Sequence, residues 1–437
     1  MVKILTFLSA IILSTNSFAQ TYWRIENERG EELLLTINIH DKNQTFETYT
    51  RKDALKEMAG SFMYMMAKTA GKIRFPELMH GEGKISFDRD TTRYIGIIDY
   101  PDKQFSLNAK IWKNNFYGLL TDNKNRTTVL TGEKVSSDKP LRDYPSLINR
   151  AFSLVEKYYW DAKLSKSSEW QNYKNDVDNL KMKIADDYEL AMTTMWLGKK
   201  LVQVPHEIKK INKTDNNLTR KNIGLARVSG NKALIFLNNI QAGKSDIDQL
   251  FKEMTDKHFD TLIFEASGSK NLSLTSALLL VNHLTSHESN WGVFLTRKWS
   301  EAGLNIPLPS MYETTLKDPL ALPMQPNSDY SEKGFYLKTI PALPLFKGKV
   351  YMLVNKGTSN VAEALAIYLK NEKIATIVGQ KTAGSPTLTE VLEIDKQYRI
   401  TIPFAQFYDK NGKSYQGIGV IPDLTTELDP LGYVLKL

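Results

Sequence analysis

Residues 350–423 contain three motifs that decide the fold of the C-terminal half of the chain. They read V-Y-M-L-V-N-K-G-T-S-N-V-A-E-A-L-A at 350–366, V-G-Q-K-T-A-G-S-P at 378–386 and Y-Q-G-I-G-V-I-P-D at 415–423. The apolar run Val350–Val354 predicts a central β-strand, and Val361–Lys370 has the apolar period of a helix. We therefore predict a strand, a short turn and a core helix whose inward positions are Val361, Ala364, Leu365, Tyr368 and Leu369.

Strands and helices alternate around these motifs from residue 221 to residue 437. Strands are predicted at 233–237, 261–264, 291–296, 349–354, 374–379 and 398–403, and helices at 245–257, 274–284 and 361–370. This alternation predicts an α/β domain, a mixed sheet with helices on its faces and sizeable parallel content. The proline-rich stretch Ser300–Phe346 has little periodicity and is predicted to be a long surface loop beside the cleft.

The segment before this domain is predicted to be helical from 138 to 220, with helices at 144–159, 167–185 and 186–201. Asp186 and Asp187 are both candidate N-caps for the third of these helices. Residues 20–137 read mainly as short strands separated by turns and form a β-rich N-terminal domain. One helix, roughly 51–70, interrupts them, and its Met-rich face (Met58, Met63, Met65 and Met66) is predicted to be core.

Residues 1–19 have the composition of a secretory signal peptide. Lys3 is the positive n-region, Ile4–Leu13 the short apolar region, and Ser17-Phe18-Ala19 the small-residue cleavage site, so that Gln20 begins the mature protein. The apolar run is too short to span a bilayer, so no integral membrane segment is expected after its removal. The predicted location is the periplasm or the medium.

The composition excludes several classes of site. The 57 basic and 49 acidic residues give a formal charge of +8, but the excess is scattered, which argues against a nucleic-acid partner. The absence of cysteine excludes disulfides, a cysteine nucleophile and thiolate metal sites. His283 and His287 have a same-face helical spacing, which a solvated face explains better than a metal site, and no cofactor is expected.

The three motifs together resemble the tail-specific (C-terminal-processing) serine peptidases, a family that includes the tricorn core and the interphotoreceptor retinoid-binding repeats. The family pattern is a strand, T-x-S-A-A-E at a helix start, G-x-x-T-x-G, and then Q/E-G-x-G-x-x-P-D. Aligning the glutamate of the first motif on Glu363 places Asn360 at the nucleophile position. The lysine-base position becomes Ser385, and the glutamate position of the last motif becomes Gln416. Of the family's glycine-rich oxyanion segment, only Gly268 persists.

An amide is not a usable nucleophile, but Asn360 is a good helix cap, and its spacing to Glu363 resembles a capping box. Ser359 is the nearest hydroxyl and the fallback nucleophile, although a loop serine that helps to cap the helix is the favoured interpretation. Lys381 and His206 are the remaining candidate bases. Lys381 lies earlier in its motif than the family lysine, at a position where the family often has a charged residue, and is interpreted as a surface residue; the residues that flank His206 do not match the family. Acyl transfer needs a nucleophile within reach of a base, and the sequence offers no matched pair.

Three hypotheses follow. The first is an exported peptidase-family protein that binds a peptide or an unfolded protein segment with little or no hydrolysis. The second is an active serine peptidase with a shifted site that uses Ser359. The third is a non-catalytic ligand-binding or assembly protein that acts through its N-terminal β domain. Of the three hypotheses, only the second requires an active enzyme.

Overall fold

The computed structural model describes residues 19–40, 43–69, 75–101, 103–198, 207–211, 223–320, 332–426 and 429–437. The chain divides into two compact units: 1–145 with 179–196, and 146–178 with 197–437. The helices of 138–220 are thus shared between the units instead of forming one of their own. The predicted signal peptide lies outside the described residues, apart from Ala19.

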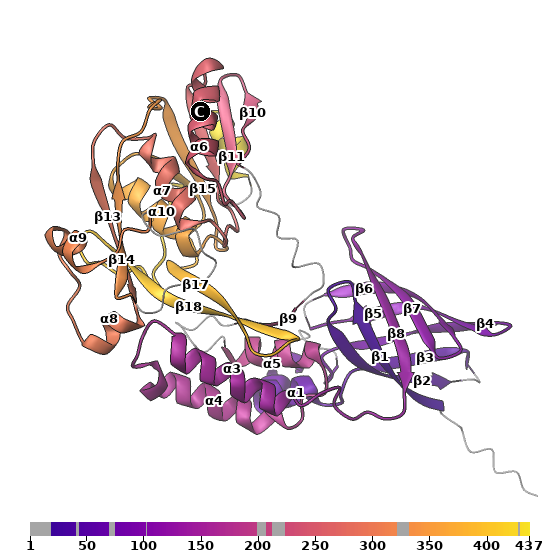
Figure 1. Ribbon diagram of the computed structural model, residues 1–437. Helices are drawn as coiled ribbons and strands as arrows, with labels where there is room; N and C mark the ends of the chain where they lie inside the picture. The colour runs from indigo at the N-terminus through magenta and orange to yellow at the C-terminus, as the bar shows by residue number, and fades with distance from the viewer. Residues whose placement is uncertain are drawn as a thin grey trace, which may run out of the picture. The chain divides into compact units, whose positions relative to one another are not determined.

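The first unit contains a closed barrel of eight antiparallel strands, each hydrogen-bonded to the next, with β1 pairing β8 to close it (Figure 1). Its strands are β1 (Ala19–Asn27), β2 (Glu32–His40), β3 (Thr45–Tyr49), β4 (His80–Asp88), β5 (Thr91–Asp99), β6 (Gln104–Trp112), β7 (Asn115–Thr121) and β8 (Thr127–Val135). Alternate side chains fill the interior: in β6, Leu107, Ala109 and Ile111 are buried while their neighbours are exposed. The predicted β-rich region is therefore a barrel with an apolar core.

Two short helices, α1 (Ala54–Ala59) and α2 (Ser61–Thr69), replace the single helix predicted between β3 and β4. Gly60, with φ of 75°, lies between them, a conformation that glycine adopts without a Cβ penalty. Met58 is buried, but Met65 and Met66 are more than half exposed. The prediction of a continuous Met-lined core face was therefore wrong.

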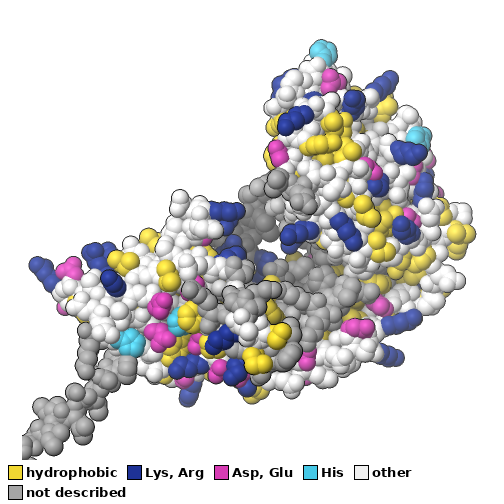
Figure 2. Space-filling view, turned by 180° about the vertical axis from the view of Figure 1, so that it is seen from behind, with side chains coloured by type: hydrophobic (Ala, Val, Ile, Leu, Met, Phe, Trp, Pro, Cys, Tyr) yellow, Lys and Arg dark blue, Asp and Glu magenta, His cyan; other side chains and the backbone are white. Residues whose placement is uncertain are grey.

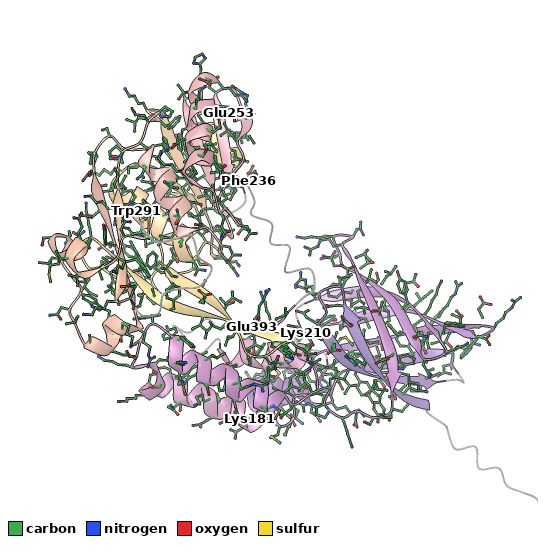
Figure 3. The ribbon with its side chains drawn as sticks, viewed as in Figure 1. Lys181, Lys210, Phe236, Glu253, Trp291 and Glu393 are labelled. Carbon is green, nitrogen blue, oxygen red and sulfur yellow. The ribbon has the colours of Figure 1, made fainter. Side chains whose placement is uncertain are left out.

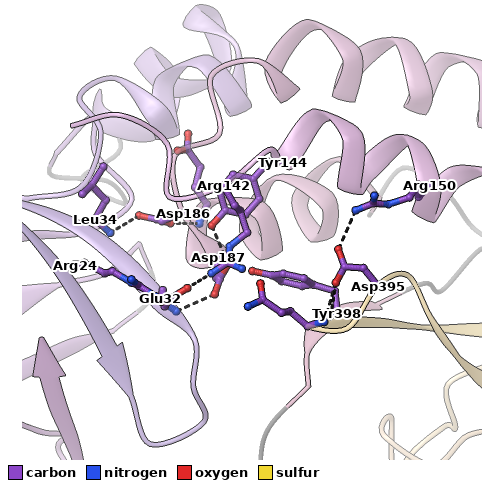
Figure 4. A network of polar contacts seen from close by, with 12 residues as sticks. Arg24, Glu32, Leu34, Arg142, Tyr144, Arg150, Asp186, Asp187, Asp395 and Tyr398 are labelled. Carbon is purple, nitrogen blue, oxygen red and sulfur yellow. Dashed lines mark hydrogen bonds and ion pairs between the residues drawn. The ribbon is translucent and has the colours of Figure 1, made fainter. Parts of the chain in front are cut away.

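A charged network joins the barrel to α5 (Asp187–Gly198) within the first unit (Figure 4). Arg24 and Arg142 both pair with the buried Glu32, and Asp187 accepts hydrogen bonds from the Glu32 N–H at 2.9 Å and the Tyr144 hydroxyl at 2.8 Å. Asp186 caps the helix by accepting from the Glu189 N–H at 2.7 Å, and it also accepts from the Leu34 N–H at 3.0 Å. Of the two candidate caps, Asp186 is the N-cap, and Asp187 is the first helical residue.

The second unit contains two sheets (Figure 1). The six-stranded sheet has the order β10-β11-β12-β15-β16-β19, with all neighbours parallel except β10 and β11. The second sheet has the order β14-β13-β18-β17, and β9 also pairs with β18. Its strands and those of the first sheet are β9 (Glu207–Lys210), β10 (Ala226–Ser229), β11 (Lys232–Phe236), β12 (Thr261–Glu265), β13 (Ser289–Thr296), β14 (Gly334–Thr339), β15 (Lys349–Val354), β16 (Thr376–Gly379), β17 (Thr387–Glu393), β18 (Tyr398–Asp409) and β19 (Leu424–Thr425).

Helices cover the sheets and complete the core. They are α3 (Tyr144–Tyr158), α4 (Ser168–Lys181), α6 (Lys244–Asp256), α7 (Leu274–Asn282), α8 (Arg297–Ala302), α9 (Tyr312–Thr315), α10 (Asn360–Asn371) and α11 (Pro430–Leu435). Side chains of α6, α7 and α10 share one core with alternate residues of the parallel sheet and with the second sheet. The opposite face of the parallel sheet packs on Val434 of α11. The fold is thus an α/β core of mixed sheet and helices, preceded by an N-terminal barrel.

The position of α10 confirms the central prediction. Val361, Ala364, Leu365, Tyr368 and Leu369 are each at most 5% exposed. Ala362, Glu363 and Ala366 are buried as well, as expected of a helix with core on every side. On this core, Trp291 of β13, which is labelled in Figure 3, stacks against Tyr368 with 4.5 Å between the ring centroids.

Two segments differ from expectation. The predicted loop Ser300–Phe346 contains the strand β14, which pairs with β13 through buried Phe335 and Leu337. The segment predicted to be helical up to residue 220 contains the strand β9. In both places the pairing partner is distant in the sequence, so no local period marks the strand.

Candidate active site

The turn between β15 and α10 is held rigidly against the end of β12. The buried Thr358 hydroxyl donates to the Ala266 carbonyl at 2.8 Å and accepts from the Asn355 N–H at 3.0 Å. The Asn355 carboxamide oxygen accepts from the N–H groups of Gly357 at 2.8 Å and Gly268 at 2.9 Å. These four contacts fix where the following two residues point.

Asn360 is the first residue of α10 and has a φ of 58°, in the left-handed region. Asparagine tolerates this region better than most residues, and a strained residue at a strand-to-helix turn is also how some hydrolases present a nucleophile. Its amide Nδ2 donates to the Lys270 carbonyl at 2.9 Å, and its Oδ1 accepts from the Thr387 hydroxyl at 3.2 Å. The amide is thus held by two other segments of the domain.

The predicted cap at Asn360 was wrong. The N-cap is Ser359, which has extended backbone and makes no side-chain cap hydrogen bond. The predicted capping box with Glu363 is also absent, because Asn360 faces Lys270 and Thr387 and Glu363 is engaged elsewhere. The left-handed backbone of Asn360 explains the difference, since a residue in that region cannot take the extended conformation of an N-cap.

Glu363 joins α10 to the 379–385 turn. Its fully buried carboxylate accepts from the Thr382 hydroxyl, from the Gly384 N–H at 2.8 Å and from the Ser385 N–H at 2.7 Å. Burial raises the pKa of Glu363, while the hydrogen bonds from Thr382 and the two N–H groups oppose that rise. This contact accounts for the glutamate, the threonine and the glycine that the two motifs contain.

Gly384 also has a steric role. A Cβ at this position would lie 3.0 Å from backbone atoms of Gly417, Ile418 and Gly419. The Gly417 N–H donates to the Gly384 carbonyl at 2.7 Å. The second and third motifs therefore pack backbone against backbone beside Asn360.

No basic side chain of the described residues forms a hydrogen bond with Asn360. Ser385 is linked to Asn360 through its backbone carbonyl, which accepts the Asn360 N–H at 2.9 Å. Within the described residues, neither the Ser385 hydroxyl nor the Ser359 hydroxyl makes a hydrogen bond, and Lys381 is exposed. His206 lies outside the described residues, as do residues 199–201.

Three further polar residues adjoin this site, and the sequence did not indicate them. Thr387 lies directly opposite Gln406 in the β17–β18 ladder. The buried Gln406 donates to Ser414 at 3.5 Å, and Ser414 accepts the Gln416 N–H at 3.2 Å. The side-chain oxygens of Gln406 and Gln416 are buried and lack a hydrogen-bond donor among the described residues. The position predicted to correspond to the family glutamate thus belongs to a cluster of amides and hydroxyls without a charge.

Two smaller predictions have different outcomes. Gly268, with φ of 72°, follows β12 and leads to Lys270, which contacts Asn360, so this segment does adjoin the candidate site. His283, predicted on a solvated face, is instead 1% exposed. Its ring stacks on Phe251 and is within 3.1 Å of the Asp248 carboxylate and 2.9 Å of the Pro344 carbonyl. It is a structural residue of the core.

The site is a strand–turn–helix in which Asn360, with left-handed backbone, begins α10. Residues 222–426 match the family model described as Peptidase family S41. Residues 222–426 thus carry a domain of the tail-specific (C-terminal-processing) peptidase family.

Individual relatives are distant. The chain is 28% identical over 78 residues to a carboxy-terminal-processing protease of Bartonella bacilliformis, and this alignment covers 18% of each protein. It is 33% identical over 79 residues to the chloroplastic C-terminal processing peptidase of Tetradesmus obliquus, covering 18% of this chain and 17% of that one. Among solved structures, a lipoprotein from Streptococcus agalactiae aligns with a TM-score of 0.42 and 14% identity, over 69% of this chain and 98% of the other.

The alignments span less than a fifth of the length of these two curated relatives. No helix within the described part of the chain is both long enough and apolar enough to cross a bilayer.

Proposed function

We propose that the α/β domain binds an extended peptide or an unfolded protein segment and hydrolyses it little or not at all. Asn360 carries this proposal. It occupies the aligned nucleophile position at the start of α10, and its amide already makes two hydrogen bonds. A carboxamide in that position cannot form an acyl-enzyme, and the aligned base position, Ser385, supplies no group that accepts a proton at neutral pH.

The edge strand β17 supports the proposal of a peptide partner. Among the described strands it pairs only with β18, and an extended peptide can bind a protein by adding a strand to such a sheet edge. It starts at Thr387, which donates to Asn360, and Val391 further along is 51% exposed. A peptide that extends β17 would therefore pass the unreactive amide.

An exposed apolar side chain lies next to the same place. Ile418, 50% exposed, follows the backbone contact between Gly417 and Gly384. An apolar side chain of the peptide would remove Ile418 from water, which contributes about 1 to 2 kcal/mol for a residue already half-buried. We assign Ile418 as a contact for the bound segment.

The binding test uses a fluorescein-labelled unstructured peptide and fluorescence anisotropy. We expect saturable binding that Ile418→Asp weakens at least about fivefold. Ile421→Asp is the matched control, because Ile421 is 65% exposed but its carbonyl contacts Lys370, at the opposite end of α10. Equal effects of the two substitutions would contradict the assigned site.

The competing hypothesis, an active site built on Ser359, has a separate test. A fluorophosphonate probe labels only a serine that is activated by a base. We expect no labelling of the wild-type protein, because the Ser359 hydroxyl has no hydrogen-bond partner in the described structure. Labelling that Ser359→Ala abolishes would establish the shifted site instead.

The proposal includes export, with Gln20 as the first residue of the mature chain and the periplasm or the medium as its location. The n-region, the apolar region and the cleavage site of residues 1–19 support it.

A further inference from the structure

The outer face of the barrel carries two pairs of like charges, each directly opposite across neighbouring strands. Glu47 of β3 lies opposite Glu82 of β4, and Arg93 of β5 lies opposite Lys110 of β6. Directly opposed side chains have Cβ atoms about 5 Å apart, and like charges at that spacing are destabilising. Two such pairs of opposite sign on one barrel are a cost that folding of the barrel alone does not explain.

The unit itself does little to neutralise these charges. Glu47 has one weak neighbour, the His80 ring, with 3.8 Å between Nε2 and Oε1. Glu82, Arg93 and Lys110 form no ion pair within the described part of the unit. Other charges of the unit are paired in the network around Glu32. The four residues are therefore available to a partner.

Apolar side chains accompany the basic pair. In the β6–β7 ladder, Tyr117 lies opposite Lys110, and Trp112 is two residues along β6 on the same face. Ile95 is two residues along β5 from Arg93 and points to the same side. These three side chains are 51%, 50% and 62% exposed. The basic pair thus lies among three apolar side chains that a partner would remove from water.

The acidic pair lines a hollow. Glu47 and Glu82, with His40, Phe46 and Ile97, border a space of about 660 Å³. A space of this size accommodates a drug-sized molecule, and therefore an aromatic side chain. Lys84 also borders the hollow, and it lies with Ile95 in the row between the two charged pairs. Acidic, basic and hydrophobic side chains are all visible on the barrel unit in the view of Figure 2.

We propose that this face is the interface between two copies of the chain, with Glu47 and Glu82 of each copy facing Arg93 and Lys110 of the other. The two pairs have the same spacing because both are direct cross-strand neighbours. A two-fold axis passing near Lys84 and Ile95 satisfies both pairs at once, and two-fold dimers are the commonest oligomers. The two copies of Lys84 then lie near the axis, and each long side chain must turn toward the hollow that it borders with Glu47 and Glu82. An acidic peptide or a nucleic-acid strand would satisfy only the basic pair, so a second copy fits the observations better.

The test is a charge exchange followed by sedimentation velocity. The wild-type chain should dimerise at about 0.05 M salt and dissociate at about 0.5 M, where screening is strong. Arg93→Glu with Lys110→Glu makes both pairs acidic, and Glu47→Lys with Glu82→Lys makes both pairs basic, so each double variant alone should dimerise at least about tenfold more weakly. An equimolar mixture of the two variants should recover dimers, because each face then meets its complement.

Lys124→Glu is the matched control. Lys124 is exposed on the β7–β8 turn, beyond the end of β7, whereas Trp112 pairs with Asn115 at the start of β7. Reversal of the charge of Lys124 should leave dimerisation unchanged. A wild-type chain that is monomeric at low salt would overturn the proposal, as would a mixture that stays monomeric although both variants are folded. If one variant fails to fold, the salt dependence of the wild-type chain and the response of the other variant still decide the question.

Discussion

Glu363→Ala should destabilise the α/β unit strongly, although Glu363 contacts neither solvent nor any proposed ligand. The carboxylate accepts from the Gly384 and Ser385 N–H groups and from the Thr382 hydroxyl, and the residue is fully buried. Alanine leaves the two N–H groups without an acceptor, and each unpaired buried donor costs about 1–3 kcal/mol. Removal of a buried carboxylate returns part of this cost, so we expect a net loss of about 3 kcal/mol in the free energy of unfolding.

Urea unfolding followed by circular dichroism and tryptophan fluorescence measures this loss. Glu363→Gln should cost less than Glu363→Ala, because its carbonyl oxygen still accepts one or two of the three hydrogen bonds. Glu253→Ala is the control, because Glu253 lies on α6 (Figure 3) and forms an exposed ion pair with Lys257. This substitution should change the free energy of unfolding by less than about 0.5 kcal/mol. If Glu363→Ala lowers the free energy of unfolding as little as Glu253→Ala does, then the hydrogen bonds of Glu363 do not stabilise the contact between the two motifs.

Three further outcomes are expected. Asn360→Ala should lower the free energy of unfolding by about 1–2 kcal/mol, because two hydrogen bonds are lost and alanine is disfavoured in the left-handed region. Asn360→Gly should lower it less, because glycine tolerates a φ of 58°, and urea titration distinguishes the two variants. Burial, reinforced by the charge of Glu189, raises the pKa of Asp186 to about 7, so the folded state holds a proton that the unfolded state releases near pH 4. The stability of the barrel unit should therefore fall as the pH rises from 4 to 7, and Asp186→Asn should flatten this dependence in urea midpoints measured across that range. N-terminal sequencing of the secreted or periplasmic protein should give Gln20 as the first residue, and a mature chain that retains Met1 would contradict the signal peptide.

The sequence predicted the elements whose periodicity is local. The strand before α10 and the five inward positions of that helix followed from an apolar run and a 3.6-residue period, and the structure has them as expected. β18 was predicted to end at Pro403 but continues to Asp409, because the ladder with β17 shifts register there and tolerates a proline at the irregularity. Barrel closure through β1 and β8 depends on a pairing between residues more than a hundred positions apart, which no local pattern encodes.

The candidate site divides in the same way. The motif spacing indicated that Asn360, Glu363, Thr382 and Gly384 belong together, and the contacts of Glu363 and Gly384 show the physical reason. The left-handed backbone of Asn360 and its contact with Thr387 were not predictable, because they depend on how the start of β17 approaches the turn. Gln406 was missed because its place beside Thr387 is a matter of strand register.

The central claim is that a peptide binds beside Asn360 and leaves uncut. The direct measurement is prolonged incubation of an unstructured peptide with the wild-type chain, read by mass spectrometry for new termini, with Asn360→Ser, Asn360→Ser with Ser385→Lys, and Ser359→Ala in parallel. We expect intact peptide with the wild-type chain, with Ser359→Ala and with Asn360→Ser alone, since Ser385 provides no base. Cleavage by the wild-type chain that Ser359→Ala abolishes would contradict the account.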